Sequence, residues 1–442
     1  MPVIDTVTPD LTQPKQASVC IIGGGIAGIS TALELAERGL DVVVLEKGEI
    51  AAEQSSRNWG WCRQMGRDRR EIPLIGVSLR LWDGMNARIG AETGFTRCGI
   101  LYLCETEAQL ATRTTWYEAN ARPHGLSTRM IGATEANALQ PGCTRPWKGA
   151  LYSPDDARAE PFIAVPAMAR ALQKKGGKVF TNCAVRGLET SGGRVSAVVT
   201  EKGTIACDSV VLAGGAWSRR FLHNLGVPLP QLTVINSVMR TEPLDTGLTR
   251  TCSGGHFAFR KRLDGGYTIS HNHLSVADIV PDSVRMFREF LPALLLDWKG
   301  LRLRLGKRFI DEARLKRSWA LDEVSPFEQV RILDPEPVAD ILDSAAKNLT
   351  GYYPVFKPMR IAERWAGAID AMPDAVPVIS KLDNLQGLHL CTGFSGHGFG
   401  LAPGAGKLMA EIVTGETPCV DPGPFRYDRF FDGSNPRPTT GL

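Results

Sequence analysis

The sequence of 442 residues predicts an α/β part with a parallel sheet joined to an α+β part with a sheet of its own. Three observations support this fold class. Glycine-rich turns between a strand and a helix occur near residues 23 and 393, and the stretch from about 229 to 353 is β-rich. Because the two turns are far apart, the first domain is predicted to be discontinuous. We expect it over residues 16–85, 150–228 and 362–432, and a second, β-sheet-rich domain over residues 86–149 and 229–361.

The first glycine-rich turn lies in the segment VCIIGGGIAGISTALELAERGLDVVVLE, which indicates strand, turn, amphipathic helix and a second strand that ends in an acid. Gly23 permits the tight turn, Gly25 lets the backbone approach a pyrophosphate, and Gly28 allows close packing of helix on strand. Glu46 would accept hydrogen bonds from ribose hydroxyls. The segment predicts a Rossmann-like dinucleotide site, and the alternative is a glycine-rich loop without a ligand. The helix N-terminus that would bind the phosphates adds Ile26 and Ala27.

The loop after Glu46 is rich in polar residues and tryptophan. Because it follows the ribose-binding acid directly, we expect it to return over the nucleotide and to reach beyond it. The alternative is a solvated loop whose tryptophans, Trp59 among them, serve packing. The residues assigned to the nucleotide are Lys47, Ser55, Ser56 and Arg57, and those assigned to a substrate are Trp61, Arg63 and Gln64.

Apolar residues recur every three or four positions from Glu71 to Ile89, which predicts an amphipathic helix. The other predicted elements are strands near Gly99–Cys104, from Lys178, over Ser209–Leu212 and over Leu388–Cys391, and helices from Pro161 and over Ala402–Val413.

The composition excludes several classes of protein. The net charge of +4 is small, and the basic groups at Arg67–Arg70 and Arg302–Arg308 are interrupted, so nothing favours nucleic-acid binding. The ten cysteines include no C-x-x-C pair and no Cys/His cluster at metal spacing, which predicts reduced thiols in the cytoplasm and no metal site. The N-terminal residues lack the apolar core of a signal peptide. No uncharged apolar run reaches the about 20 residues of a membrane span.

The stretch from Phe287 to Phe309 places Leu, Phe and Trp before a basic, leucine-rich segment. A surface helix of this kind can lie in a membrane interface, which would make the protein peripheral to the inner membrane. The alternative is a helix whose apolar face is buried in the second domain.

The second glycine-rich turn, GFSGHGFG, also lies between a strand and a helix. Its backbone N–H groups would converge at the helix N-terminus, where partial positive charge suits the negative charge of a reduced flavin ring. His397 would donate to that ring or transfer a proton, and the alternative is a structural hydrogen bond. The residues assigned to this loop are Gly393, Gly396, His397, Gly398 and Phe399.

Together, GGGIAG with LEK, the strand at Ala184–Val185, AGGAWS and GFSGHGFGLAPG resemble the FAD-dependent amine and amino-acid oxidoreductases typified by D-amino-acid oxidase, glycine oxidase and sarcosine oxidase. The resemblance covers nearly the whole chain. It implies a fold of the glutathione-reductase/D-amino-acid-oxidase type, FAD as the cofactor, and substrate binding by the β-rich domain. It also implies that Val185 contacts the adenine through its backbone, and that Gly214, Gly215 and Trp217 line the nucleotide.

A closer likeness is to the bacterial L-amino acid deaminases, on the segments EKGEIAAEQSSR, KVFTNCAVRGLET, VVTEKG, SPFE and RWAGAIDAMPDAVPVIS. It implies oxidative deamination of an α-amino acid, of the L series, to an imino and then a keto acid and ammonia, by hydride transfer from Cα–H to flavin N5. It places Arg260 at the substrate carboxylate and Trp365 at the active-site tryptophan. The alternatives are a surface cation for Arg260 and a core aromatic for Trp365. The electron acceptor would be oxygen, a quinone or another carrier.

Three departures from the deaminases keep other substrates open. The chain lacks their N-terminal membrane anchor, Trp61 replaces a polar residue near the substrate, and the GFSGHGFG segment resembles the sarcosine and glycine oxidases, with Gly400 in place of their carboxylate-binding lysine. The alternatives are therefore an N-methyl amino acid, an opine or a D-amino acid, and, from other classes, a flavoprotein subunit that passes electrons to a partner or an NAD-dependent dehydrogenase. Gly367 and Asn58 stand where some relatives tether the flavin through Cys or His, which predicts non-covalent FAD.

Overall fold

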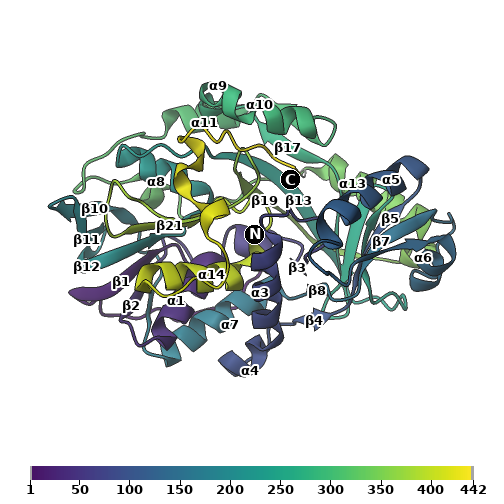
Figure 1. Cartoon of the computed structure of the whole chain (residues 1–442), viewed down its shortest axis with the longest axis horizontal. Coiled ribbons are helices and arrows are strands. Elements are labelled where there is room, and N and C mark those ends of the chain that lie inside the picture. Colours follow the sequence, from purple (N-terminus) through teal and green to yellow (C-terminus); the bar gives the residue numbers. More distant parts are fainter. Residues whose placement is uncertain (1, 440–442) are drawn as a thin grey trace.

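The computed structural model describes residues 2–439 and contains two large sheets, each covered by helices (Figure 1). The first sheet has eight strands in the order β10–β11–β12–β1–β2–β9, with β21 beside β12 and β20 beside β21. This sheet and a separate, antiparallel-rich one confirm the predicted fold class. The strands of the first sheet are β1 (Gln16–Ile22), β2 (Val42–Leu45), β9 (Lys178–Phe180), β10 (Val185–Ser191), β11 (Arg194–Thr200), β12 (Gly203–Leu212), β20 (Val378–Lys381) and β21 (Leu388–Thr392).

The core of the first sheet is parallel, because β21, β12, β1, β2 and β9 all run in one direction. All four residues of β2, VVVL, are buried, as expected for a parallel strand covered on both faces. Helices α1 (Ile26–Glu37), α7 (Pro161–Lys174) and α14 (Gly398–Thr414) lie along one face of this sheet (Figure 1). Since α1 follows β1 and α14 follows β21, both helices begin at the same edge of the sheet.

Helix α14 begins at Gly398, four residues before the predicted start. Its glycines pack against α1 and against α3 (Ile72–Asp83) at distances that exclude a side chain. A Cβ atom on Gly406 would lie 2.6 Å from the carbonyl carbon of Ser30, and one on Gly404 would lie 2.8 Å from the carbonyl oxygen of Leu74. The low helix propensity of this glycine-rich segment is therefore overridden by tertiary packing.

The second sheet has ten strands in the order β18–β17–β13–β16–β15–β14–β5–β7–β6, with β19 beside β13. Strand β19 pairs antiparallel with β13 from Ala371 opposite Leu232 to Ile361 opposite Thr241. Because β7 and β19 belong to this sheet, it includes segments that the predicted domain boundaries place in the first domain. The strands are β5 (Ile100–Cys104), β6 (Arg129–Gly132), β7 (Gly149–Ser153), β13 (Leu232–Thr241), β14 (Thr251–Gly254), β15 (Phe257–Lys261), β16 (Tyr267–Ser270), β17 (Ser275–Asp278), β18 (Leu301–Arg304) and β19 (Ile361–Ala371).

The remaining elements connect or cover these sheets. A small sheet contains β3 (Trp61–Cys62), β8 (Ala157–Arg158) and β4 (Thr96–Arg97). The other α-helices are α2 (Gln54–Arg57), α4 (Met85–Ile89), α5 (Glu107–Trp116), α6 (Ala133–Leu139), α8 (Ser218–Asn224), α9 (Pro281–Arg285), α10 (Phe287–Leu296), α11 (Lys307–Arg314), α12 (Pro326–Gln329) and α13 (Ala339–Tyr352). A π-helical segment, Tyr117–Ala121, continues α5.

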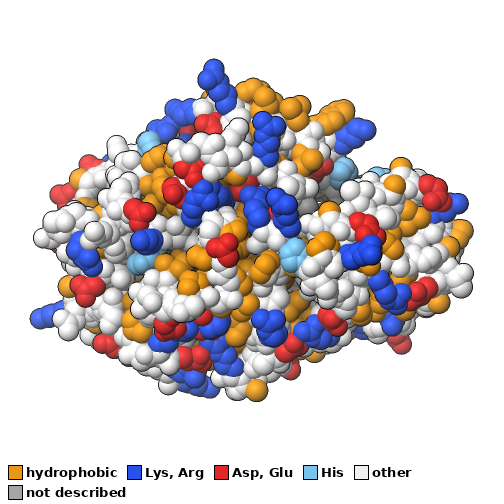
Figure 2. Space-filling model, in the orientation of Figure 1, with side chains coloured by type: hydrophobic (Ala, Val, Ile, Leu, Met, Phe, Trp, Pro, Cys, Tyr) orange, Lys and Arg blue, Asp and Glu red, His pale blue; other side chains and the backbone are white. Residues whose placement is uncertain are grey.

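The stretch from Phe287 to Phe309 forms α10, β18 and the start of α11, and α10 has no buried residue. The alternative that its apolar face packs into the second domain holds only in part, because residues 290–294 are half-buried while both ends of the helix are exposed. Phe287, Leu295 and Trp298 are 55%, 66% and 63% exposed. Figure 2 shows the resulting apolar side chains in orange over α10 at the top of the view. Among the described residues, no helix is both long and apolar enough to cross a membrane.

Candidate functional site

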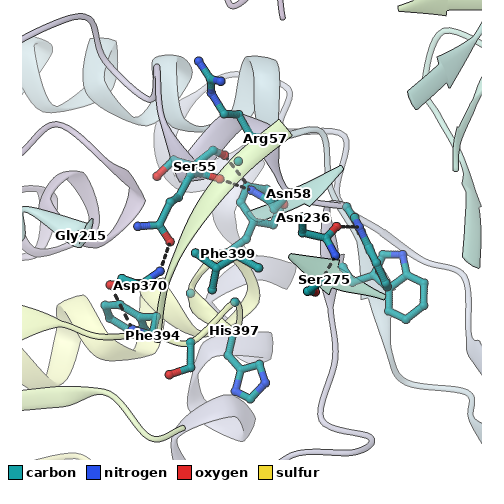
Figure 3. A pocket seen from close by; sticks show the side chains of 18 of the residues that line it. Ser55, Arg57, Asn58, Gly215, Asn236, Ser275, Asp370, Phe394, His397 and Phe399 are labelled. Atoms are coloured by element: carbon teal, nitrogen blue, oxygen red, sulfur yellow. Dashed lines mark hydrogen bonds between the residues drawn. The ribbon is translucent and has the colours of Figure 1, made fainter. Parts of the chain in front are cut away.

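A cavity of about 1310 Å³ is lined by residues from both large sheets. One end lies at the first glycine-rich turn, at Gly23 and Gly25, and the other at the loops of the second sheet, at Asn236 and His271. Figure 3 shows part of it, with Ser55 and Asn58 on one side, His397 and Phe399 on another, and Asn236 beside Ser275. The sequence motifs from distant parts of the chain therefore meet at one cavity.

The first glycine-rich turn has backbone geometry that only glycine fits. Gly23 has φ +112°, and a Cβ atom there would lie 2.4 Å from the carbonyl oxygen of Ala213. A Cβ atom on Gly28 would lie 2.0 Å from the carbonyl oxygen of Gly23, so Gly28 serves helix packing and does not line the cavity. The N-terminus of α1, with Ile26 and Ala27, opens into the cavity.

Glu46 directly follows β2 and lines the cavity next to this turn. Its carboxylate accepts hydrogen bonds from the backbone N–H groups of Gly24 and Gly48, both at 2.7 Å. Burial raises the pKa of Glu46. The two hydrogen bonds fix the direction of the carboxylate, and each oxygen keeps a lone pair for a ribose hydroxyl.

Helix α2 brings the predicted phosphate-binding residues to the cavity in different ways. Ser55 Oγ accepts a hydrogen bond from the N–H of Ile26 at 2.8 Å, so it caps α1. Ser56 is buried outside the cavity lining. Arg57 lines the cavity, but its guanidinium pairs with Asp334 and donates to the carbonyl oxygen of Ala366 at 2.9 Å. In Figure 3 this side chain extends away from the other labelled residues.

The cavity is also lined by Val185, Gly214, Gly215 and Trp217, which the resemblance assigns to the nucleotide, and by Lys47. Lys47 Nζ lies 4.4 Å above the centre of the Trp217 ring and forms an ion pair with Glu53 at 2.7 Å. Trp217 Nε1 donates to the same carboxylate at 3.0 Å. These contacts hold Lys47 and Trp217 as one rigid wall.

The second glycine-rich turn is anchored by Asp370 of β19. The carboxylate accepts a hydrogen bond from Gly393 N–H at 2.8 Å, and burial raises the pKa of Asp370 to about 6. Ser395 and Gly396 have φ of +50° and +80°, so the turn needs the left-handed conformation at two consecutive residues. Gly396, Gly398 and Phe399 line the cavity, whereas Gly393 does not.

His397 lines the cavity at the start of α14, and its side chain is fully buried apart from that face. Its Nδ1 lies 3.1 Å from a carboxylate oxygen of Glu71. Burial and then the charge of Arg67 lower the pKa of His397 to about 4. Burial alone would raise the pKa of Glu71, but His397 and Arg67 outweigh it and hold that pKa below its usual value. At neutral pH the pair is thus a neutral imidazole that donates Nδ1–H to a carboxylate.

Arg67 is the strongest feature that the sequence analysis did not assign to the site. It lines the cavity and is buried, and its Nη1 has no hydrogen-bond partner among the described residues. Its Nε donates to the carbonyl oxygen of Arg63 at 3.1 Å. Burial and then Arg63 lower the pKa of Arg67 to about 10, so it remains charged at neutral pH. The only sequence signal for Arg67 is that it belongs to the basic group at Arg67–Arg70, and that group by itself bears only on nucleic-acid binding.

Other predicted residues lie outside the cavity lining. Arg260 is 1% exposed, and its guanidinium binds both carboxylate oxygens of Glu160, at 2.7 and 3.0 Å. Trp365 is buried and donates from Nε1 to the carbonyl oxygen of Arg57 at 3.0 Å. Both side chains therefore lie in the core, where they donate to the backbone of Trp59 and Arg57. Of the residues assigned to the substrate pocket, Gln64, which is buried, and Gly400 also lie outside the lining.

Gly400 cannot be replaced by a longer residue, because a Cβ atom there would lie 2.9 Å from the Cα of Cys62. Trp61 and Arg63, in contrast, do line the cavity, as predicted from sequence. The structure adds Tyr102 and Trp116, from β5 and α5, to this side of the cavity.

The cavity fits an elongated dinucleotide. Two helix N-termini, at Ile26 and Gly398, open into it, and each concentrates backbone N–H groups that favour negative charge. Gly25 has no side chain at the N-terminal cap of α1, where a Cβ atom would lie 3.0 Å from Ser55 Oγ. The acid Glu46 lies directly after β2 and beside the first glycine-rich turn, as a ribose contact requires.

Known proteins share this architecture. A family model described as FAD dependent oxidoreductase matches residues 18–412. The L-amino acid deaminase from Proteus myxofaciens, solved in complex with anthranilate, has a TM-score of 0.93 at 36% identity, covering 97% of this chain and 96% of that one. The L-amino acid deaminase from Proteus vulgaris has a TM-score of 0.91 at 35% identity, covering 97% and 100%. Glycine oxidase from Pseudomonas aeruginosa is 26% identical over 416 residues, 92% of this chain and 97% of its own length.

The match to the family extends from the first glycine-rich turn through α14 and so includes both sheets and the cavity between them. The chain therefore belongs to the D-amino-acid-oxidase family of FAD-dependent oxidoreductases, and FAD is the cofactor that this family uses.

Proposed function

We propose that this enzyme oxidises the Cα–N bond of an α-amino acid of the L series, giving an imino acid that water converts to a keto acid and ammonia. The likeness to two L-amino acid deaminases at TM-scores of 0.93 and 0.91 supports this reaction. The single observation in the structure that carries it is Arg67, a buried guanidinium with a free Nη1 that lines the same cavity as the second glycine-rich turn.

Arg67 suits the α-carboxylate of the substrate because a guanidinium presents planar pairs of N–H donors to carboxylates. A buried donor without a partner is costly, and a bound carboxylate removes that cost. We assign the carboxylate to Arg67 rather than to Arg260, whose donors already bind Glu160 and Trp59. Trp59 and Trp61, with ring centres 5.1 Å apart, supply an apolar wall beside it.

Bound FAD would supply the oxidant that accepts a hydride from the substrate. Its phosphates would lie at Gly25, Ile26 and Ala27, its ribose at Glu46, and its ring at the turn from Gly396 to Phe399. His397 would orient the substrate amine. Because Nδ1–H is donated to Glu71, Nε2 keeps its lone pair and can accept a hydrogen bond from the amine, and with its pKa lowered to about 4 it stays a neutral acceptor.

Anaerobic mixing of the yellow holoenzyme with L-, D- and N-methyl amino acids tests this proposal. We expect only L-amino acids to bleach the flavin absorbance, at about 450 nm, with release of ammonia under turnover. Arg67→Met should lower kcat/KM about 10- to 100-fold, from the loss of a charged hydrogen bond. Arg67→Lys keeps the charge without the planar fork and should recover part of the loss. Bleaching by D- or N-methyl amino acids alone would replace the L-amino acid with that class.

We further propose that FAD binds without a covalent bond. The side chain of Asn58 is occupied, because its Oδ1 accepts from Gly60 N–H at 2.7 Å and its Nδ2 donates to Ser55 O at 2.9 Å. Gly367 offers no side chain. Cys391 lines the cavity, but burial raises the pKa of its thiol to about 12, which keeps it protonated and unreactive. Acid precipitation should leave all flavin in the supernatant, and a yellow pellet would contradict the proposal.

We also propose that the exposed face of α10 lies against the surface of a membrane. Phe287, Leu295 and Leu296 are exposed on it, Trp298 is exposed two residues after its end, and Arg302 and Arg304 follow in β18. Apolar side chains next to basic ones are the combination by which a surface helix binds anionic lipid.

A further inference from the structure

Three arginines gather on one wall of the cavity around Tyr102 of β5. The Cζ atoms of Arg63 and Arg113 lie 5.7 and 4.6 Å from the centre of the Tyr102 ring. Arg67 is adjacent, since its Nε binds the carbonyl oxygen of Arg63. Arg113 comes from α5, so this wall joins the second sheet to the helix that covers it. We call Arg63, Arg67 and Arg113 the arginine wall.

No carboxylate among the described residues forms an ion pair with any arginine of the wall. The nearby carboxylates are instead hydrogen-bonded to other groups. Glu71 binds His397 at 3.1 Å. Asp156 accepts from the N–H groups of Gln64 and Met65 at 2.8 and 3.2 Å, and burial raises the pKa of Asp156 to about 6. Glu105 accepts the hydroxyl hydrogen of Tyr352.

The charges of Glu71 and Asp156 raise the pKa of Arg67 and so balance part of the wall, but neither carboxylate forms an ion pair with any of its guanidinium groups. Arg67 is fully buried, and the charge of Arg63 is the second cause, after burial, of its lowered pKa. Uncompensated like charges in a partly desolvated cavity repel each other strongly. One substrate carboxylate bound to Arg67 would neutralise one of these charges. Arg63 and Arg113 would still have no bound anion.

The contact of both guanidiniums with Tyr102 is a cation–π contact, which takes up no conventional hydrogen-bond acceptor, so their N–H donors remain available to an anion. The hydrogen bond of Arg63 goes to the carbonyl oxygen of Met65, and Arg113 makes none with the described residues. The aromatic ring thus holds two cationic donors at the side of the cavity.

We propose that the substrate carries a second carboxylate, which binds Arg63 and Arg113 while the α-carboxylate binds Arg67. This rests on the proposed function, because it names the substrate class of the same site. The second carboxylate belongs either to the side chain of an acidic α-amino acid or to a carboxyalkyl group on the amine. In both cases the substrate is a diacid, with one carboxylate on the reacting Cα and the second a few bonds from the reacting Cα–N bond.

Titration of the oxidised holoenzyme with inert acids tests the wall without requiring turnover. Glutarate carries two carboxylates and butyrate one, and each shifts the flavin spectrum when it binds near the ring. We expect glutarate to bind about tenfold or more tightly than butyrate, as expected for an additional charged hydrogen bond. Arg113→Met should remove this preference, and Arg113→Lys should restore part of it. Equal binding of the two acids by the parent enzyme would overturn the proposal.

Arg129→Met is the matched control. The Cζ atom of Arg129 lies 5.5 Å from the centre of the Tyr152 ring, so it makes the same type of contact on a neighbouring strand, but it does not line the cavity. This variant should keep the preference for glutarate. A loss of preference in Arg129→Met equal to that in Arg113→Met would show a general effect on the fold and contradict the proposed site.

Anaerobic bleaching then separates the two sources. L-Glutamate compared with L-glutamine tests the side-chain carboxylate, and iminodiacetate compared with sarcosine tests the one on the amine. We expect the diacid of one pair to be favoured about tenfold or more in kcat/KM, with Arg113→Met reducing that ratio. If no amino acid bleaches the flavin but glutarate still binds through Arg113, the proposed deamination fails and the second carboxylate site stands. If neutral amino acids react as well as diacids, the substrate class proposed here is wrong.

Discussion

Arg260 shows how much the role of one residue depends on its burial. Its guanidinium lies in the core with Glu160, and a further hydrogen bond goes to the carbonyl oxygen of Trp59. Glu160 also accepts from the N–H of Leu263 at 2.8 Å. Both charges are therefore satisfied within the protein, and the pair ties the loop of Trp59 to β15. Without Glu160 the charge of Arg260 would be buried without a carboxylate, whereas without Arg260 the carboxylate of Glu160 would keep Arg158 at 3.3 Å and Arg262 at 4.0 Å.

At the scale of the residue, Glu160→Leu should lower the free energy of unfolding by about 3–5 kcal/mol, the cost of leaving the buried charge of Arg260 unpaired. The double variant Glu160→Leu with Arg260→Met should recover part of that loss, because the buried charge of Arg260 is then absent, and Arg260→Met alone should cost less, because Glu160 keeps Arg158 and Arg262. Urea unfolding of the three proteins measures both effects. If Arg260→Met instead kept full stability and raised KM strongly, Arg260 would be the carboxylate ligand that the resemblance implies.

Helix α10 carries large apolar side chains that its neighbours in the fold do not bury. It exposes large apolar side chains, and polar residues would satisfy a solvated surface helix better. Its last turn, with Leu296, reaches the lining of the cavity, as does the next residue, Asp297. The proposed lipid-binding face and the mouth of the site therefore lie on one element.

At this scale, the protein should sediment with vesicles of phosphatidylglycerol and much less with vesicles of phosphatidylcholine, because Arg302 and Arg304 add an attraction for anionic lipid. Leu295→Asp together with Trp298→Ser should abolish sedimentation and leave the flavin content unchanged. Leu263→Asp alters a leucine that is 56% exposed but lies outside α10 and serves as the control. Sedimentation that survives the double change would remove α10 from membrane binding.

At the scale of the whole molecule, sequence was sufficient where the physical requirement is local. The first turn needs glycine at Gly28 because the carbonyl oxygen of Gly23, in the same unit, approaches there, and the φ of +112° at Gly23 is set by the turn itself. Glu46 follows its strand at a fixed spacing, so its place beside the turn was also predictable. The fold class followed from these units, because each unit specifies a strand edge and the helix that leaves it.

The residues that sequence missed depend on contacts between distant segments. Arg67 borders the cavity because α14 and β5 approach its loop from positions far along the chain. Arg113 lies in a helix without buried residues, and its pattern looks like that of any surface helix. The ion pair of Arg260 could not be predicted for the same reason, since its partner Glu160 is 100 residues away. Each of these roles is fixed by tertiary neighbours, which no local pattern encodes.

The common starting edge of α1 and α14 has a consequence for how the protein is made. The two helices lie against each other with the same polarity, and both N-termini open into one cavity. Parallel dipoles side by side repel, and the repulsion is greatest at the ends that face the cavity. A dinucleotide with negative charge at both places would relieve it, so cofactor binding would stabilise the folded protein. Supply of flavin during synthesis would then set the yield of folded protein, by the linkage that makes any ligand of the native state a stabiliser.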